Sequence, residues 1–455
     1  MSYSPHLRTA VLLSGSGTGG AYHAGVLRAL HEAGVKIDVM SGRGIGTVGA
    51  VFAAVDAAPK TWEEGGLWRR KPSVHLYRWR LALQWAAALA VLAVAVLLVP
   101  LLVLATGLIA YPLSFLVQMI SVDTGSRMAV AYAAMIGAAF GPTALPTILP
   151  RLITLLLAAA FIVLGAAAAR SPTPLLSRGA HRDRGRWWAR LVGSPWTSDP
   201  GLVHFRQSLW QIFRGPTTAK EPPPPEFSRR YTELLVDNLG QPGFRELILT
   251  ALDLETRTDL VFAALTEPRR QSFFHRRGAS GDLIDLAGVG RSQVLDALAG
   301  SLSVEVLTES QPMVFSPESY WKGETHRICD RPAAVGRLML ELAAAGVEQV
   351  IVVSAVANRA APHRLTKTTR TLESRLAEHL SAAEASAIRD AIGTHSLRFR
   401  GIFLIQPAHN PVGPFDFDGA FDEGSDRYQT LGELVDRGYE DAYRQFIEPM
   451  MGGAE

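Results

Sequence analysis

The chain contains one long stretch without a charged side chain, from Leu81 to Val122. Roughly 20 apolar residues in a helix cross the hydrocarbon core of a bilayer, so this stretch is about twice the length needed for one crossing. A short polar break at 123–127 is followed by two further apolar runs, Met128–Pro150 and Leu152–Ala169. A buried helix of a soluble protein rarely runs this far without a charge. The block therefore predicts membrane-spanning helices.

Basic residues flank this block on both sides. Five arginines and lysines lie between Arg69 and Arg80, and six arginines lie between Arg170 and Arg190. Segments rich in Lys and Arg stay on the cytoplasmic side, so both flanks are expected there, which requires an even number of spans, two or four. The first apolar run, Thr9–Leu13, is too short for a signal peptide. We therefore expect an integral membrane protein whose remaining domain lies on the cytoplasmic face.

Outside the block, short apolar strands alternate with helical patterns. Thr9–Leu13 and Val35–Met40 read as strands, and each is followed by a glycine-rich turn and a helix. Beyond the block, Glu246–Leu252 and Asp259–Leu265 read as a strand pair, and Gln349–Ser354 reads as a buried strand. This alternation predicts an α/β fold with a doubly wound, mostly parallel sheet, interrupted by the transmembrane helical insertion.

These patterns divide the chain into five parts. Residues 1–66 and 229–412 form the two parts of the α/β domain, and residues 67–190 form the transmembrane insertion with its basic flanks. Residues 191–228, which include four consecutive prolines, read as a linker. Residues 413–455 form a C-terminal tail and helix.

The composition narrows the possible partners. Cys329 is the only cysteine, so the chain has no disulfide framework. The formal net charge is only +3, and the arginines cluster beside apolar runs instead of alternating with aromatic residues. We therefore expect membrane lipids as partners and no nucleic acid, no cofactor and no metal, whereas the sequence makes no prediction about protein partners.

The first glycine-rich turn is SGSGTGG, between the first strand and the first helix. Gly15, Gly17 and Gly20 satisfy the spacing G-x-G-x-x-G, which lets backbone amides and a helix N-terminus face an anion. The anion could be the pyrophosphate of a dinucleotide or the oxyanion of an acyl-transfer reaction. A tight turn that needs glycines only for its backbone conformation is the alternative.

The second turn, SGRGIGTVGA, follows the second strand. A sharp strand-to-helix turn among small residues is the geometry of a nucleophile elbow, normally G-x-S-x-G. Here Gly42 and Gly46 occupy the outer positions, Arg43 precedes the central one, and Gly44 stands where the serine would be. A third segment, GETHRICDRP, carries a carboxylate at Glu324 and ends in a tight turn at Asp330–Pro332.

Taken in order, these segments resemble the patatin-like phospholipase family. That family has a glycine-rich oxyanion loop of the type GGGxRG, a helix of the type GxLxxL, a serine elbow about two dozen residues later, and a turn of the type DGGxxxNxP that carries an aspartate. The matching segments here are LSGSGTGGAYHAGVLRAL and SGRGIGTVGA, within the first 57 residues. LILTALDLETRTDLVF and QVIVVS extend the likeness, and the apolar block and the tail after Gly413 lie outside it.

The resemblance implies hydrolysis of lipid acyl esters by a Ser–Asp dyad without histidine. Carried over by position, the nucleophile falls on Gly44 and the dyad carboxylate falls on Glu324, since Glu324 and Pro332 keep the spacing of the family's turn. The arginine of the oxyanion loop has become Gly19, and one loop glycine has become Ser16. The loop thus comprises Gly15, Ser16, Gly17, Gly19 and Gly20. These departures predict a membrane-anchored lipid-acyl-hydrolase fold with impaired catalysis, a pseudoenzyme that binds or senses lipid.

Two alternatives stay open. In the first, an active acyl hydrolase uses a different hydroxyl, with Ser16, Ser41 and Thr47 nearest in sequence. In the second, the chain is a dinucleotide-binding membrane protein of Rossmann type, with Asp38 as the acidic residue. Arg43 also has two interpretations, as a guanidinium that contacts a lipid phosphate or as a solvated elbow residue.

Overall fold

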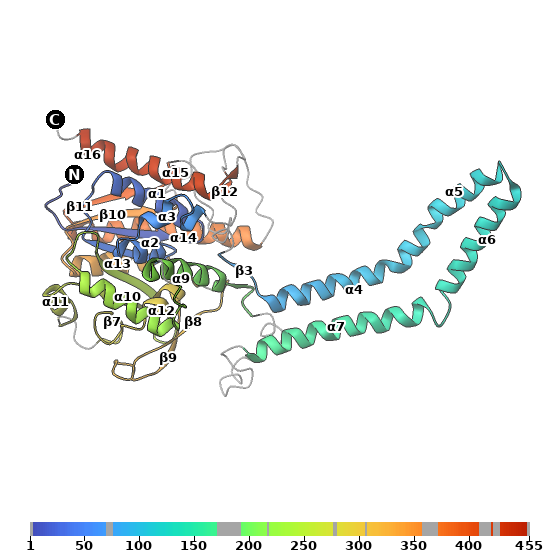
Figure 1. Ribbon diagram of the computed structural model, residues 1–455, viewed down its shortest axis with the longest axis horizontal. Helices are drawn as coiled ribbons and strands as arrows, with labels where there is room; N and C mark the ends of the chain where they lie inside the picture. Colours follow the sequence, from blue (N-terminus) through green and yellow to red (C-terminus); the bar gives the residue numbers. More distant parts are fainter. Residues whose placement is uncertain are drawn as a thin grey trace. The chain divides into compact units, whose positions relative to one another are not determined.

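The computed structural model describes nine segments of the chain: residues 3–69, 76–170, 193–215, 218–275, 280–304, 307–356, 372–408, 420–421 and 428–452. Most of the basic flank at 171–190 lies outside these residues. The chain forms two compact units (Figure 1). An α/β unit comprises 1–78 and 196–455, and a helical unit comprises 79–195.

A nine-stranded sheet forms the centre of the α/β unit, in the order β11-β10-β1-β2-β5-β6-β7; β9 also pairs with β5, and β8 pairs with β9. Its strands are β1 (Thr9–Gly15), β2 (Val39–Gly44), β5 (Glu246–Asp253), β6 (Thr258–Ala264), β7 (Leu283–Asp285), β8 (Gln311–Val314), β9 (Thr325–Cys329), β10 (Gln349–Ser354) and β11 (Gly401–Ile405). The run from β11 to β5 is parallel, and β6 and β9 are antiparallel to β5. The expected mostly parallel α/β sheet is confirmed.

Helices cover both faces of the sheet because β-strand side chains alternate between them. Val11, Leu13 and Met40 point into one core, and Ala10 and Leu12 point into the other. The first core is covered by α1 (Gly19–Glu32), α2 (Gly46–Ala54), α3 (Pro59–Trp62), α9 (Asp199–Arg214), α10 (Pro224–Asn238), α12 (Val294–Leu302) and α15 (Leu431–Ala442). The second is covered by α11 (Arg269–His275), α13 (Ala334–Ala344) and α14 (Leu372–His395).

The C-terminal helix α15 packs tightly against α1, the first helix of the chain. A Cβ built on Gly25 would lie 1.8 Å from the carbonyl oxygen of Val435, and one on Gly438 would lie 2.1 Å from that of Tyr22. The missing side chains let the two backbones approach each other. After α15 the chain continues through a π-helical turn (Tyr443–Ile447) and α16 (Glu448–Gly452). The C-terminal helix is therefore part of the α/β unit and not an appendage.

Two elements differ from the sequence-based expectations. The second strand begins at Val39 instead of Val35. Within the expected linker 191–228 lies α9, whose Phe205 and Leu209 are fully buried. The amphipathic pattern of α9 is hard to recognise between proline-rich neighbours.

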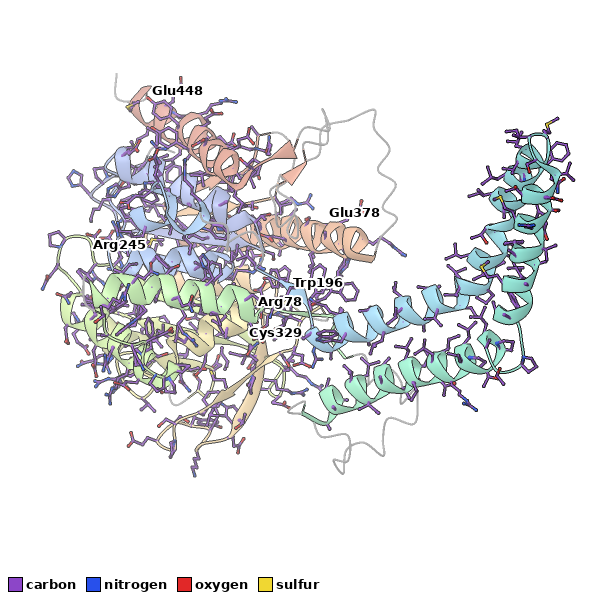
Figure 2. All side chains as sticks on the ribbon, turned by 45° about the vertical axis from the view of Figure 1, so that its right-hand side comes forward. Arg78, Trp196, Arg245, Cys329, Glu378 and Glu448 are labelled. Atoms are coloured by element: carbon purple, nitrogen blue, oxygen red, sulfur yellow. The ribbon has the colours of Figure 1, made fainter. Side chains whose placement is uncertain are left out.

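Small elements complete the α/β unit. They are the 3-10 turn Leu67–Arg69, the paired strands β3 (Arg78–Trp79) and β4 (Trp196–Thr197), and the paired strands β12 (Ala420–Phe421) and β13 (Tyr428–Gln429). Figure 2 labels Arg78 and Trp196, which belong to the first pair. They mark the two points between which the helical unit is inserted in the chain.

The helical unit is a hairpin of α4 (Leu81–Ala105), α5 (Gly107–Gln118), α6 (Val122–Ala139) and α7 (Leu145–Arg170). The α4 and α7 helices lie side by side, as do α5 and α6 (Figure 1). Small side chains such as Ala86 and Ala93 are buried in this unit. Close packing through small residues is typical of helices in membranes. Two helical stretches of the described chain, Leu81–Gln118 and Leu145–Ala169, are long and apolar enough to cross a bilayer.

Candidate functional site

The turns after β1 and β2 lie side by side at the carboxyl end of the sheet. The two strands pair in parallel, with Ser14 opposite Arg43 and Gly15 opposite Gly44. The glycine-rich loop therefore meets the elbow. Gly17 (φ 53°) and Gly44 (φ 55°) both adopt the left-handed region that favours glycine. Ligands of open α/β sheets bind at this end of the strands, so this is the candidate site.

Gly44 has no room for a side chain in this conformation. A Cβ atom built on it would lie 2.2 Å from the carbonyl oxygen of Gly15 and 3.1 Å from Oδ2 of Asp330. The first contact involves backbone, so no side-chain rotation can relieve it. The glycine at the nucleophile position is thus also a packing requirement.

The same carbonyl accepts the hydrogen bond that an oxyanion would need. Ile45 N–H donates to the carbonyl oxygen of Gly15 at 2.9 Å. In a nucleophile elbow, the N–H of the residue after the nucleophile forms part of the oxyanion hole. Here this donor is occupied by a neutral acceptor from the loop that would otherwise supply further donors. The oxyanion hole is therefore not formed.

Arg43 is fully buried and ties three elements together. Its Nε donates to Oδ1 of Asp330 at 3.0 Å, and its Nη2 donates to the other carboxylate oxygen. Its Nη1 donates to Oγ of Ser14 at 3.1 Å and lies 3.5 Å from Oε2 of Glu384, on α14. The Ser14 hydroxyl in turn donates to Glu384. Both sequence-based interpretations of Arg43, as a head-group contact and as a solvated residue, are therefore wrong.

Burial and charge act against each other in this cluster. Burial lowers the pKa of the Arg43 guanidinium, but the charges of Asp330 and Glu384 outweigh it and raise that pKa. Burial raises the pKa of Glu384, although Arg43 opposes the shift. A buried bidentate pair loses solvation that only good geometry and full hydrogen bonding can offset. Asp330, the carboxylate nearest to Gly44, is therefore held in an ion pair with Arg43.

The structure does not bring Glu324, the expected dyad carboxylate, to this cluster. Glu324 precedes β9 and Asp330 follows it, so a five-residue strand of about 17 Å separates them. The Glu324 side chain is 66% exposed and lies 3.4 Å from Nε2 of His326, whose Nδ1 lies 2.7 Å from Oδ2 of Asp253. Spacing to Pro332 selected a carboxylate that lies away from the two glycine-rich turns. The tight turn that begins at Asp330 is the sequence feature that could have pointed to this residue.

Other glycines of the loop are also fixed by packing. A Cβ on Gly20 would lie 2.1 Å from the ring of Trp68, and one on Gly19 would lie 2.8 Å from Cβ of Ala355. The elbow is equally tight, because a Cβ on Gly46 would lie 2.2 Å from a carbonyl oxygen of β1 and one on Gly42 would lie 2.6 Å from the backbone of Gly46. Both turns are therefore closely packed from within.

Two of the three hydroxyls near the elbow lack the partners of a nucleophile among the described residues. The hydroxyls of Ser41 and Thr47 are buried and have no hydrogen-bond partner among the described residues. Ser16, on the loop, is also buried. A nucleophilic hydroxyl requires a base within hydrogen-bonding reach. Within the described part of the chain, Glu384 is the carboxylate of this cluster that contacts a serine. That serine is Ser14, which is fully buried.

His23 lies beneath the loop and was not singled out by sequence reasoning. Its ring is buried, and its Nε2 lies 2.9 Å from the carbonyl oxygen of Ser14. Burial lowers the pKa of His23 to about 4, and the charge of Arg43 adds to the effect. The ring is therefore neutral at pH 7 with its Nε2 proton donated to a backbone carbonyl, which makes it a support of the loop and not a base.

Asp38 does not occupy the position that a dinucleotide would require. It precedes β2, and its Oδ2 accepts a hydrogen bond from the backbone N–H of Thr9 at 2.9 Å. Both residues lie at the amino ends of their strands, whereas the glycine-rich loop lies at the carboxyl end. An acidic residue that binds a ribose lies at the carboxyl end of the second strand. This placement argues against the Rossmann alternative.

No protein-family model matches the chain. Over 62 residues, 13% of its length, the chain is 40% identical to patatin-like phospholipase domain-containing protein 6 of Mus musculus, and equally so to the proteins of that name from Pongo abelii and Homo sapiens. The match spans only 4–5% of those proteins. Among solved structures, VipD from Legionella pneumophila aligns with 99% of this chain and 68% of its own, at a TM-score of 0.32 and 11% identity. A distant relationship to patatin-like phospholipases is therefore supported over a short segment.

Proposed function

We propose that this chain is a membrane-anchored, patatin-like pseudoenzyme that binds membrane lipid without hydrolysing acyl esters. The proposal rests above all on the Gly15 carbonyl oxygen, which takes the Ile45 N–H and occupies the space of a side chain at Gly44. Arg43 adds a second obstacle, since it holds Asp330 in a buried ion pair. Nucleophile, oxyanion hole and free carboxylate are all needed for acyl transfer, and their losses here reinforce one another.

The surface of the hairpin supports the membrane anchor. Large apolar side chains are exposed along both legs, as the sticks of Figure 2 show, among them Leu97, Leu102, Leu155 and Ile162. Soluble proteins rarely expose contiguous apolar patches of this kind. Lipid tails would cover these side chains without a free-energy cost.

The sheet supports an even number of crossings. The β1 and β2 strands precede the hairpin in sequence, and their partners β10 and β5 follow it. Strands of one sheet lie on one side of the membrane, so the chain between them crosses an even number of times. With α4 and α7 as the crossing helices, the hairpin would make two crossings, and the basic flanks support a location of the α/β unit on the cytoplasmic face.

An ester-hydrolysis assay tests the catalytic part of this proposal. The full chain, reconstituted in phospholipid vesicles, should release no more p-nitrophenol from a p-nitrophenyl ester, and no more free fatty acid from the vesicles, than protein-free vesicles do. A fluorophosphonate probe should label neither Ser16 nor any other serine. Turnover at enzyme-like rates that Asp330→Asn abolishes would overturn the pseudoenzyme, and labelled Ser16 would identify the substitute nucleophile.

A flotation assay tests the anchor. The protein should float with vesicles in a density gradient and resist extraction by alkaline carbonate, as integral membrane proteins do. Release into the carbonate supernatant would contradict insertion of the hairpin.

A further inference from the structure

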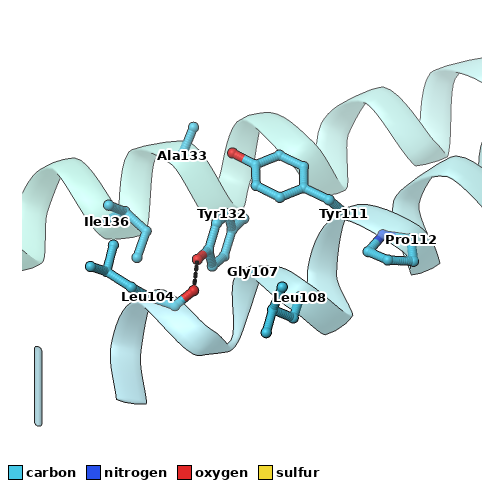
Figure 3. A pocket seen from close by; sticks show the side chains of 8 residues that line it. All are labelled: Leu104, Gly107, Leu108, Tyr111, Pro112, Tyr132, Ala133 and Ile136. Carbon is cyan, nitrogen blue, oxygen red and sulfur yellow. Dashed lines mark hydrogen bonds between the residues drawn. The ribbon is translucent and has the colours of Figure 1, made fainter. Parts of the chain in front are cut away.

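The bend of the hairpin contains a cavity of about 670 Å³ between α5 and α6 (Figure 3). We propose that this cavity binds a neutral membrane lipid with a free hydroxyl group, a diacylglycerol, and the proposal rests on the membrane anchoring argued above. The lining residues that matter are Gly107, Leu108, Tyr111, Pro112, Tyr132 and Ala133.

The cavity is shaped by a tyrosine that crosses from α6 to α4. The hydroxyl of Tyr132 donates to the carbonyl oxygen of Leu104 at 3.1 Å, the bond drawn in Figure 3. Gly107 makes this possible, because a Cβ there would lie 2.5 Å from the Tyr132 hydroxyl. The Tyr111 ring meets the Tyr132 ring edge to face, with centroids 5.1 Å apart. The hollow is therefore held open by specific contacts and is not a loose gap between helices.

One backbone carbonyl beside the cavity lacks its usual helical donor. Pro112 has no N–H, so the carbonyl of Leu108, four residues earlier, loses the donor that an α-helix would provide. Leu108 and Pro112 both line the cavity, so this carbonyl lies next to it. In a hydrocarbon environment a carbonyl without a donor is unfavourable. A ligand with a hydroxyl group would supply the missing donor.

The Tyr111 hydroxyl supplies the complementary donor. Tyr111 lies three residues after Leu108, hence on the same side of α5. No hydrogen bond to its hydroxyl joins it to another described residue. A lipid hydroxyl could therefore donate to the Leu108 carbonyl and accept from Tyr111 at the same time. A phosphatidylcholine has no hydroxyl with which to make this pair of bonds.

The depth of the cavity fits the hydroxyl of a diacylglycerol. Trp85 near the start of α4 and Tyr111 in α5 are both exposed and 26 residues apart (111 − 85). That distance is about 39 Å of helix, against roughly 30 Å of hydrocarbon core. Trp and Tyr gather at the two interfaces of a membrane. Tyr111 therefore lies near the head groups of the far leaflet, where a glyceride hydroxyl resides, with the apolar hollow available to its chains.

Photocrosslinking in vesicles tests the proposal. The full chain is reconstituted in phosphatidylcholine vesicles that contain, at equal mole fraction, either a diacylglycerol or a phosphatidylcholine with the same diazirine-bearing acyl chain. Labelled peptides are mapped by mass spectrometry. The diacylglycerol should label α5 and α6 several-fold more than the phosphatidylcholine does, and unlabelled diacylglycerol should compete with it.

Three variants locate the site. Tyr111→Phe removes one hydrogen bond and should lower diacylglycerol labelling roughly five-fold. Ala133→Trp fills the hollow and should abolish labelling. Ala131→Trp adds the same bulk at an exposed position of α6 that does not line the cavity, and should leave labelling unchanged.

The outcomes separate this proposal from the membrane anchor. Equal labelling by both lipids, or labelling that Tyr111→Phe and Ala133→Trp leave unchanged, would overturn the diacylglycerol site while the protein still floats with vesicles. Stronger competition by a sterol than by diacylglycerol would also overturn it. Failure to float would overturn the membrane anchor itself. Carbonate resistance of Ala133→Trp shows that the variant is still inserted.

Discussion

The α/β unit holds charged groups inside and leaves few large apolar side chains exposed, whereas the hairpin exposes most of its leucines and valines. In the α/β unit, Arg43 and Glu384 are buried and paired. In the hairpin, Leu97 is 62% exposed and Ile162 is 71% exposed. Under the proposed membrane anchoring, the two units fold for different solvents: burial of charge is offset by pairing in the first, and exposure of hydrocarbon is offset by lipid in the second.

The largest effect should come from the buried charge. Arg43→Leu leaves Asp330 and Glu384 without their cation, so we expect the free energy of unfolding to fall by about 3–5 kcal/mol. Urea denaturation followed by the fluorescence of the buried tryptophans measures this. Arg327→Leu is the matched control, because its ion pair with Glu255 is roughly half exposed and should cost less than about 1 kcal/mol. Similar losses for the two variants would mean that burial of Arg43 has no special role.

Exposed leucines should respond differently in the two units. Leu92→Arg in the middle of α4 places a guanidinium in the hydrocarbon core, at an insertion cost of about 2.5–3.5 kcal/mol. We expect a large part of the protein to become extractable by alkaline carbonate. Leu397→Arg, at a fully exposed position of the α/β unit, should change neither extraction nor stability by a measurable amount. Equal behaviour of the two variants would remove the distinction between the two surfaces.

Restoring a serine at the elbow should destabilise the protein without creating activity. Gly44→Ser forces a Cβ against the Gly15 carbonyl oxygen, which should cost about 1–3 kcal/mol, and ester hydrolysis should stay at background. Gly34→Ser is the matched control, since Gly34 also has a positive φ (64°) but open space around it. It should show only the backbone strain of about 1 kcal/mol. Hydrolysis by Gly44→Ser would show that the loop can reorganise into an oxyanion hole.

The smallest effect concerns acid stability. The folded pKa of His23 is about 4, below its ordinary value of 6.5, so the unfolded state binds a proton that the folded state does not. The stability contributed by neutral His23 is complete above about pH 6.5 and is lost as pH falls towards 4. Between pH 7.5 and 5.5 the loss should be about 1 kcal/mol. His23→Gln should remove this slope, and His31→Gln, on the exposed end of α1, should keep it.

Local patterns predicted the architecture but not the electrostatics. The strand at Gln349–Ser354 and the glycine-rich turns follow from short stretches of sequence, because hydrophobic period and turn chemistry are local. The pairing of Arg43 with Asp330 joins residues 287 positions apart, and no local pattern encodes it. The orientation of the Gly15 carbonyl is likewise a backbone choice made by the packing of two turns. The glycines at positions 15 and 44 permit this carbonyl orientation, but their presence in the sequence does not predict it.

The position of β1 has a consequence for the order in which the protein can assemble. This strand precedes the hairpin in the chain, yet one of its two neighbours is β10, and α1 is covered by α15. Both of those elements follow the hairpin. In the proposed membrane protein, β1 and α1 therefore stay incompletely covered while the hairpin is inserted, so that insertion precedes closure of the sheet.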